Sequence, residues 1–263
     1  MRFRPCIDIH NGKVKQLVGG SLKDEGNQAK ENFVADSGSD YFADMYKKDG
    51  LAGGHIIILN HKDSEYFDAT KKQAMRALAT YPKGMQIGGG INADNAADYI
   101  EAGASHVIVT SYVFKDGEVN YQNLNSLVEA VGKDKIVLDL SCRMKNGKYY
   151  VVTDRWQKFT DLELNVETMN MLAQYCDEFL IHGVDVEGKG NGMDEALVKI
   201  LAQTKKDNPN FNAITYAGGI ASFEDIERFE RYCDGHIDFT IGSALDIFGG
   251  DLPYREVAAR YNE

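Results

Sequence analysis

Fragments of this chain recur in the same order after roughly 130 residues, about half of its 263-residue length. Three pairs of fragments share this spacing: CIDIHNGK and VLDLSCRMKNGK, GGGI and AGGI, and VIVTS and FTIGS. The first pair carries Asp8 and Asp139, each followed by an Asn-Gly-Lys step. Ordered repeats at one long period predict a domain built from two similar halves, approximately 1–131 and 132–263.

Short β-rich runs alternate along the chain with amphipathic stretches that suit helices. We expect eight strands, at Phe3–Asp8, His55–Leu59, Met85–Ile87, His106–Thr110, Lys135–Leu140, Phe179–Gly183, Asn212–Tyr216 and Ile237–Ile241. We expect helices at Ser39–Lys48, Ala69–Thr80, Ala93–Ala102, Tyr121–Val131, Val166–Cys176, Met193–Thr204, Ser222–Tyr232 and Tyr254–Tyr261. This alternation predicts an α/β protein, a (β/α)8 TIM barrel that occupies residues 1–263 as a single domain.

Charge and composition exclude several classes of partner. A formal charge of −11 and a pI near 5.1 argue against a surface for nucleic acid or anionic membrane, because phosphate backbones require clustered Lys and Arg. The sequence contains no apolar run of the roughly 20 residues that span a bilayer, and its start lacks the apolar core of a secretory signal. The four cysteines are widely scattered, so we expect reduced thiols, no disulfide and a cytoplasmic location.

Asp8 and Asp139 are the strongest catalytic candidates. They end the first and fifth predicted strands, which lie opposite each other in an eight-stranded ring, at the end where barrel active sites gather. If both side chains point inward, two carboxyl groups face each other across one opening. Such a pair divides acid and base roles when the surroundings separate the two pKa values. The alternative is that each carboxylate caps a turn or pairs with a cation such as Arg4 or Arg143.

Glycine-rich turns follow the third and seventh predicted strands, and short hydroxyl-bearing turns follow the fourth and eighth. Glycine lets backbone amides approach an anion closely, and the next helix adds its positive end. The predicted phosphate contacts are Gly89, Gly90, Thr110 and Ser111 in the first half, and Gly218, Gly219, Gly242 and Ser243 in the second. Two such sites imply a ligand with a phosphate at each end. Neither matches a dinucleotide fingerprint or a Walker A loop.

The remaining candidates are aromatic side chains and one long connection. Trp156, the only tryptophan, is expected either to stack on a planar heterocycle or to pack on the barrel rim. His10 and His182 lie near strand ends and are candidate substrate contacts. His55, His61, His106 and His236 are expected to be structural or solvated, and the histidine spacing predicts no metal site. The connection from about Asn11 to Asp36 is expected to be either a lid or a disordered insertion.

Across nearly its whole length the chain resembles the phosphoribosylformimino-aminoimidazole carboxamide ribotide isomerases of histidine biosynthesis, especially the fungal and plant type. The resemblance rests on CIDIHNGKVKQLVGG, QIGGGI, VIVTS, VLDLSCR, RWQ with TDLELN, FLIHGVDVEG, YAGGI and IGSALDIFGG, in this order. It implies a (β/α)8 barrel with half-barrel symmetry that acts without a cofactor or metal.

The resemblance also implies roles for individual residues. Asp8 would be the general base, Asp139 the general acid, and Trp156 the cover of the aminoimidazole ring. Bacterial members have a threonine near the end of the sixth strand, where this chain offers His182 or Asp185 as a replacement. The implied reaction is an Amadori rearrangement of an aminoaldose with two phosphates into an aminoketose.

Two other functions are compatible with such a barrel. The cyclase subunit of imidazole glycerol phosphate synthase shares the paired aspartates and phosphate sites. However, it usually reads CLDV with a lysine-rich continuation, and it needs a glutaminase, whereas this chain reads CIDIHNGKVKQL. The second alternative is a barrel that binds sugar phosphates without catalysis. We expect a monomer that acts on a small bis-phosphate.

Overall fold

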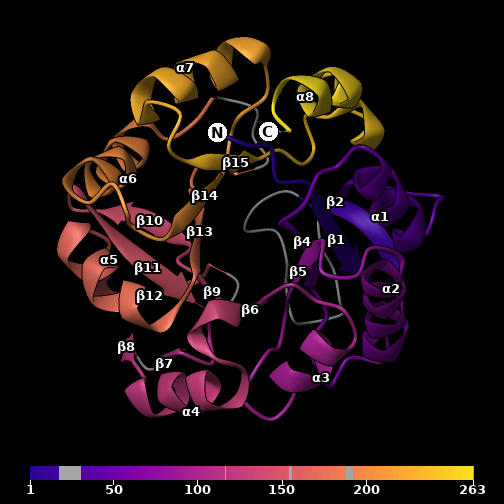
Figure 1. Cartoon of the computed structure of the whole chain (residues 1–263), viewed down its shortest axis with the longest axis horizontal. Helices are drawn as coiled ribbons and strands as arrows, with labels where there is room; N and C mark the ends of the chain where they lie inside the picture. The colour runs from indigo at the N-terminus through magenta and orange to yellow at the C-terminus, as the bar shows by residue number, and fades with distance from the viewer. Residues whose placement is uncertain (18–30, 116, 154–155, 188–191, 263) are drawn as a thin grey trace.

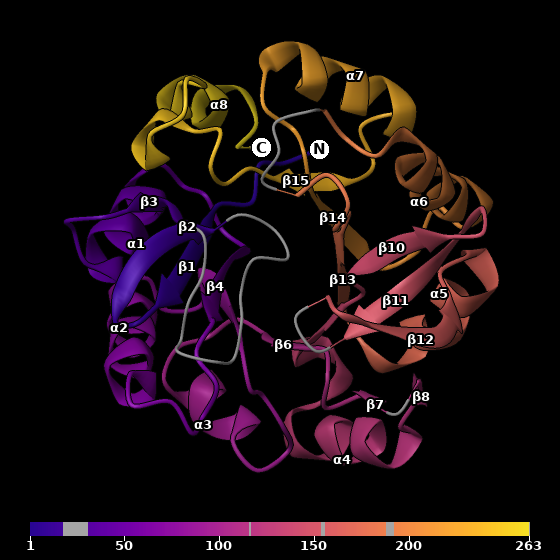
Figure 2. The ribbon, with the colours of Figure 1, turned by 180° about the vertical axis from the view of Figure 1, so that it is seen from behind.

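A ring of eight parallel strands surrounded by helices forms the body of the protein (Figures 1 and 2). The computed structural model describes residues 1–17, 31–115, 117–153, 156–187 and 192–262. The ring strands are β1 (Cys6–His10), β4 (Gly54–Ile58), β5 (Met85–Gly88), β6 (Val107–Val109), β9 (Ile136–Asp139), β13 (Glu178–His182), β14 (Ala213–Ala217) and β15 (Asp238–Thr240). Each pairs in parallel with its neighbour in the order β1-β4-β5-β6-β9-β13-β14-β15.

The ring closes between β15 and the first residues of the chain. Phe3 forms a parallel bridge with Phe239, and the Arg4 N–H donates to the Phe239 carbonyl at 2.8 Å. The Phe239 N–H donates in turn to the Arg2 carbonyl at 3.1 Å. At the same seam, the buried guanidinium of Arg4 forms a 2.8 Å ion pair with Asp238. These contacts confirm the predicted (β/α)8 barrel.

The helices of the outer layer lie close to their predicted positions. They are α1 (Ser39–Lys48), α2 (Phe67–Thr80), α3 (Ala96–Glu101), α4 (Tyr121–Val131), α5 (Val166–Leu172), α6 (Glu195–Asp207), α7 (Phe223–Cys233) and α8 (Tyr254–Arg260). Four of them begin at a side chain that accepts a hydrogen bond from a backbone amide of the first turn: Asn120, Asn165, Asp194 and Ser222. Helices α3 and α5 are several residues shorter than predicted, because α3 starts later and α5 passes into a 3-10 turn, Ala173–Tyr175.

Side-chain alternation divides the core into two parts. Ile7 and Ile9 are fully buried in the large layer between the strands and helices. A small separate cluster of Ile108, Val137 and Leu180 fills the inside of the ring. The intervening β1 position, Asp8, therefore faces the inside of the barrel, as the sequence predicted. Both predicted bounds of the first strand, Phe3 and Asp8, were wrong by two or more residues, because β1 begins at Cys6 and continues past Asp8 to His10.

Hairpins follow β1 and β9, where the sequence predicted connections without named strands. β2 (Lys13–Leu17) and β3 (Glu31–Val34) extend the main sheet beyond β1, and β10 (Cys142–Lys145), β11 (Lys148–Thr153) and β12 (Lys158–Glu163) form a separate sheet. A short third hairpin joins β7 (Phe114–Lys115) to β8 (Glu118–Val119). Half of the predicted lid, residues 18–30, lies outside the described residues.

The first two hairpins turn through the same backbone conformation. The turn after β1 has φ angles of 51° at Asn11 and 73° at Gly12, and the turn after β10 has 53° at Asn146 and 79° at Gly147. Positive φ at both central residues is typical of a type I′ hairpin turn, and Asn-Gly is its preferred sequence. The repeated Asn-Gly-Lys step thus forms the same local structure twice. The duplication of complete halves stays a prediction.

Breaking the ion pair at the seam should destabilise the barrel. We expect Arg4→Met to lower the free energy of unfolding by about 3 kcal/mol, because it leaves the carboxylate of Asp238 without its buried partner. Arg2 contacts the same carboxylate at 3.3 Å but its side chain is 49% exposed, so Arg2→Met should cost less than about 1 kcal/mol. Urea unfolding of both variants measures the difference. Equal losses would contradict a special role for the buried pair.

Candidate active site

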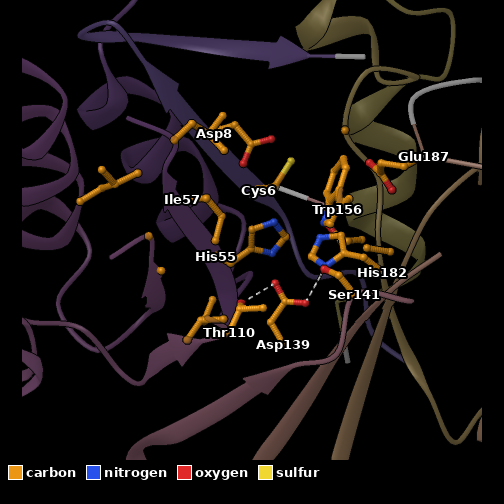
Figure 3. A pocket seen from close by; sticks show the side chains of 18 of the residues that line it. Cys6, Asp8, His55, Ile57, Thr110, Asp139, Ser141, Trp156, His182 and Glu187 are labelled. Atoms are coloured by element: carbon orange, nitrogen blue, oxygen red, sulfur yellow. Dashed lines mark hydrogen bonds and ion pairs between the residues drawn. The ribbon is translucent and has the colours of Figure 1, made fainter. Parts of the chain in front are cut away.

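A cavity of about 1180 Å³ opens at the carboxyl ends of the ring strands (Figure 3). His10 aside, all but one of the residues that the sequence singled out as site residues line it: Asp8, Gly89, Gly90, Thr110, Ser111, Asp139, Trp156, His182, Gly218, Gly219, Gly242 and Ser243. The structure therefore brings both carboxyl groups and all the predicted phosphate contacts to one site.

Asp185 is the exception, and the structure does not support a substrate contact there. Its carboxylate accepts hydrogen bonds from the Arg143 Nε at 2.8 Å and from the Met144 N–H at 3.3 Å, which join it to the β10 strand. Arg143 is thus engaged with Asp185, and Arg4 with Asp238. Among the described contacts, neither arginine pairs with Asp8 or Asp139, so the alternative in which Arg4 or Arg143 neutralises one of these two aspartates is wrong.

Asp139 is surrounded by hydrogen-bond donors. The Ser141 hydroxyl donates to its Oδ1 at 2.8 Å, the Thr110 hydroxyl donates to its Oδ2 at 3.3 Å, and the His182 Nδ1 lies 3.2 Å from Oδ1 (Figure 3). Burial by itself would raise the pKa of Asp139, but His182 and the two hydroxyls together hold the pKa below its usual value. The site therefore favours an ionised Asp139.

The neighbouring imidazoles carry opposite charge preferences. Burial lowers the pKa of His182, but the charge and hydrogen bond of Asp139, with further carboxyl groups nearby, raise it to about 9. Burial, and then the charge of His182, lower the pKa of His55 to about 3. The ring centroid of His182 lies 6.4 Å from that of His55 and 6.0 Å from that of Trp156. The cavity thus favours a cationic His182 beside a neutral His55.

Two of the histidine predictions need correction. His55 was expected to be structural or solvated, yet its buried ring lines the cavity beside His182. His61 also lines the cavity, but its side chain is 61% exposed, as expected for a solvated residue. His10 was a candidate substrate contact, but it is buried at the end of β1 and is not among the residues that line the cavity.

Asp8 faces Glu187 across the cavity (Figure 3), and the charge of Glu187 disfavours ionisation of Asp8. Burial, reinforced by the charge of Glu187, raises the pKa of Asp8 from 3.8 to about 7, while His182 acts in the opposite direction. Burial also raises the pKa of Glu187. Sequence reasoning missed Glu187, although it lies in the FLIHGVDVEG stretch, because only His182 and Asp185 of that stretch were considered as site residues. Its only signal was an acidic residue soon after a predicted barrel strand.

Glycine is required in the predicted phosphate turns by backbone angle and by space. The φ angles are +100° at Gly89, +135° at Gly218 and +75° at Gly219. A Cβ atom on Gly89 would lie 2.1 Å from the Ile58 carbonyl oxygen, and one on Gly219 would lie 2.0 Å from the Gly192 carbonyl oxygen. These turns bring bare backbone to the cavity wall, which is the geometry that anion-binding turns use.

Other features of the site concern metals, thiols and membranes. Within the described ranges, no group of three or more His, Cys, Asp or Glu side chains is arranged to hold a metal ion. The four cysteines are free and buried. No helix among the described residues is long and apolar enough to cross a bilayer.

The raised pKa of Asp8 predicts that its replacement stabilises the fold in a pH-dependent way. The folded state penalises the ionised carboxylate, so the wild-type protein loses stability as the pH rises from about 4 to about 7, whereas Asp8→Asn does not. We expect the stability advantage of Asp8→Asn to grow by up to about 4 kcal/mol over this interval. Denaturant unfolding at pH 4.5 and pH 8 measures it. The exposed Asp134→Asn serves as control, and an equal pH response in both variants would refute the shift.

Comparison with known proteins agrees with this geometry. A Medicago truncatula protein named 1-(5-phosphoribosyl)-5-((5-phosphoribosylamino)methylideneamino) imidazole-4-carboxamide isomerase, chloroplastic, is 52% identical to the chain. The alignment covers the whole of this chain and 82% of the relative. It is also 46% and 43% identical over its full length to isomerases of the same chemical name from Yarrowia lipolytica and Saccharomyces cerevisiae, covering 98% of each. The family profile described as "Histidine biosynthesis protein" matches residues 2–252. The chain therefore belongs to this histidine biosynthesis family.

Proposed function

We propose that the protein catalyses the Amadori isomerisation of phosphoribosylformimino-aminoimidazole carboxamide ribotide to its phosphoribulosyl form in L-histidine biosynthesis. The observation that carries this proposal is the placement of Asp8 and Asp139 in one cavity that also contains both sets of glycine turns. The names of the relatives support the same reaction, an intramolecular oxidoreduction that interconverts an aminoaldose and an aminoketose. The substrate is a small molecule with a phosphate at each end.

The proposed reaction needs an acid and a base in sequence. Protonation of the ribose ring oxygen from the Asp139 side opens the furanose to a Schiff base. Asp8 then takes the proton from C2 to give an enolamine, which tautomerises to the ketose. A pKa of about 7 suits Asp8 to this step, because general bases work best when their pKa lies near the working pH.

Binding of the two phosphates would hold the reacting carbons between the acids. Gly89, Gly90, Thr110 and Ser111 would bind one phosphate, and Gly218, Gly219, Gly242 and Ser243 the other. Energy from these remote contacts is then used to position the sugar. Trp156, which lies beside His182 at the cavity wall, is the surface on which the aminoimidazole ring would stack.

The alternatives differ from the isomerase in what they require. A cyclase subunit needs ammonia from a glutaminase, whereas the isomerase converts the aminoaldose alone, and the relatives' printed names favour the isomerase. A non-catalytic barrel would have no need of two differently tuned carboxyl groups. The monomeric state and the cytoplasmic location stay predictions, and the chloroplastic name of the plant relative describes that protein.

Loss of either carboxyl group should stop turnover while leaving ligand binding intact. We expect Asp8→Asn and Asp139→Asn each to lower kcat by roughly 10² to 10⁴, with substrate affinity changed only slightly, because each variant removes a proton-transfer group without removing a phosphate contact. An absorbance assay with the aminoaldose and calorimetric binding of the product measure both effects. The exposed Asp134→Asn is the control. Native turnover by either site variant would exclude acid–base roles for that residue.

A side chain in the second glycine turn should weaken substrate binding. We expect Gly219→Ala to raise KM at least tenfold, because its Cβ atom must displace the Gly192 carbonyl and distort the turn. Gly132→Ala is a matched control: Gly132 has a similar φ of +80° but lies in open space away from the cavity. Both variants share the backbone cost of positive φ, so only Gly219→Ala should change KM. An unchanged KM would remove this turn from the phosphate site.

A further inference from the structure

The surroundings of Asp139 conflict with a simple role as the resting proton donor. A general acid must carry a proton before the reaction, but Asp139 is held between the Ser141 hydroxyl, the Thr110 hydroxyl and the His182 imidazole. Hydrogen bonds donated to both oxygens stabilise the carboxylate rather than the acid. The proton that opens the ring must therefore be held elsewhere in the site.

We propose that His182 stores this proton, and that the catalytic acid is the hydrogen-bonded pair of a His182 imidazolium and an Asp139 carboxylate. This assignment rests on the proposed isomerase function and gives it a different acid from the one that the sequence resemblance implies. The geometry behind it is the 3.2 Å contact between the His182 Nδ1 and the Asp139 Oδ1, with the imidazole at the cavity wall.

The charged groups that face His182 all favour its protonated form. Asp139 on β9 contacts it directly, and Asp8 on β1 and Glu187 after β13 add negative charge from other directions. His55 on β4 lies beside it, and its own burial keeps it neutral. Trp156 packs on the imidazole from the loop between β11 and β12, without a charge of its own. Of the two neighbouring imidazoles, His182 is thus the one that keeps a proton at neutral pH.

The proton balance of the cycle closes with these groups. The N–H bond of His182 breaks, directly or by relay through Asp139, an O–H bond forms at the ribose ring oxygen, and the electron pair of the N–H bond stays on the imidazole. Asp8 then gains the C2 proton as the enolamine forms. Tautomerisation moves one proton from the C2 hydroxyl to C1. Return of the proton from Asp8 to His182 through water restores both groups, so no external reagent is consumed.

Nitrogen NMR of the histidine side chains tests where the proton resides, independently of turnover. We expect His182 in the wild-type protein to be an imidazolium at pH 7 and to titrate near pH 9, while His55 stays neutral between pH 5 and pH 9. Asp139→Asn should lower the titration midpoint of His182 by more than one pH unit, because it removes the facing charge. A neutral His182 at pH 7 in the wild-type protein would overturn the proposal.

Kinetics test whether the stored proton is used. We expect the kcat of the wild-type protein to fall above about pH 9, where His182 loses its proton. We expect His182→Gln to lower kcat at least a hundredfold with KM within threefold, and to abolish this alkaline limb. The exposed His236→Gln should keep the native profile. Native kcat with the alkaline limb retained in His182→Gln would refute the role. Failure of the wild-type protein to convert the aminoaldose would instead refute the proposed function, and the NMR result would still stand.

Discussion

Closure of the strand ring is the constraint on which the site depends. The hydrogen bonds that Phe239 forms with Arg2 and Arg4 place β1 between β15 and β4, so that four steps around the ring separate β1 from β9 in either direction. Asp8 and Asp139 reach one cavity for this reason, although 130 residues lie between them. An open sheet with the same strand order would leave its first and last strands at opposite edges. The packing of the seam is therefore also a requirement for catalysis.

The two aspartates have similar sequence contexts but opposite electrostatic surroundings. Two residues after Asp139, Ser141 donates a hydrogen bond to it, whereas two residues after Asp8 the chain has His10, which is buried away from the cavity wall. Asp139 also has a cationic His182 beside it, and Asp8 faces another carboxyl group. Similar hairpins and turns thus support a site whose two sides differ in charge. This difference allows one side to supply a proton while the other removes one.

Much of this architecture was predictable because strands, helices and glycine turns follow local rules. The eight barrel strands were predicted near their observed positions, and side-chain alternation correctly turned Asp8 inward. The position of Glu187 at the cavity and of Asp185 outside it was not predictable, because alternation places residues reliably only within a strand and β13 ends at His182. His55 was misjudged because it lies early in β4, far from the carboxyl end where sites gather. Only the three-dimensional packing shows its ring next to His182.

Charge placement explains why an imidazolium suits the reacting centre. A bis-phosphate adds strong negative charge to a cavity that already contains Asp8, Asp139 and Glu187, and this charge must be offset. Neutral backbone amides of the glycine turns bind phosphate by their dipoles, and Lys62 and Lys71 are the cationic lysines among the described cavity-lining residues. None of these groups contacts Asp139 in the described structure. A charged His182 therefore remains available to the sugar. The approach of an anionic ligand raises the pKa of His182 further, so the imidazole keeps its proton until the ribose ring oxygen accepts it.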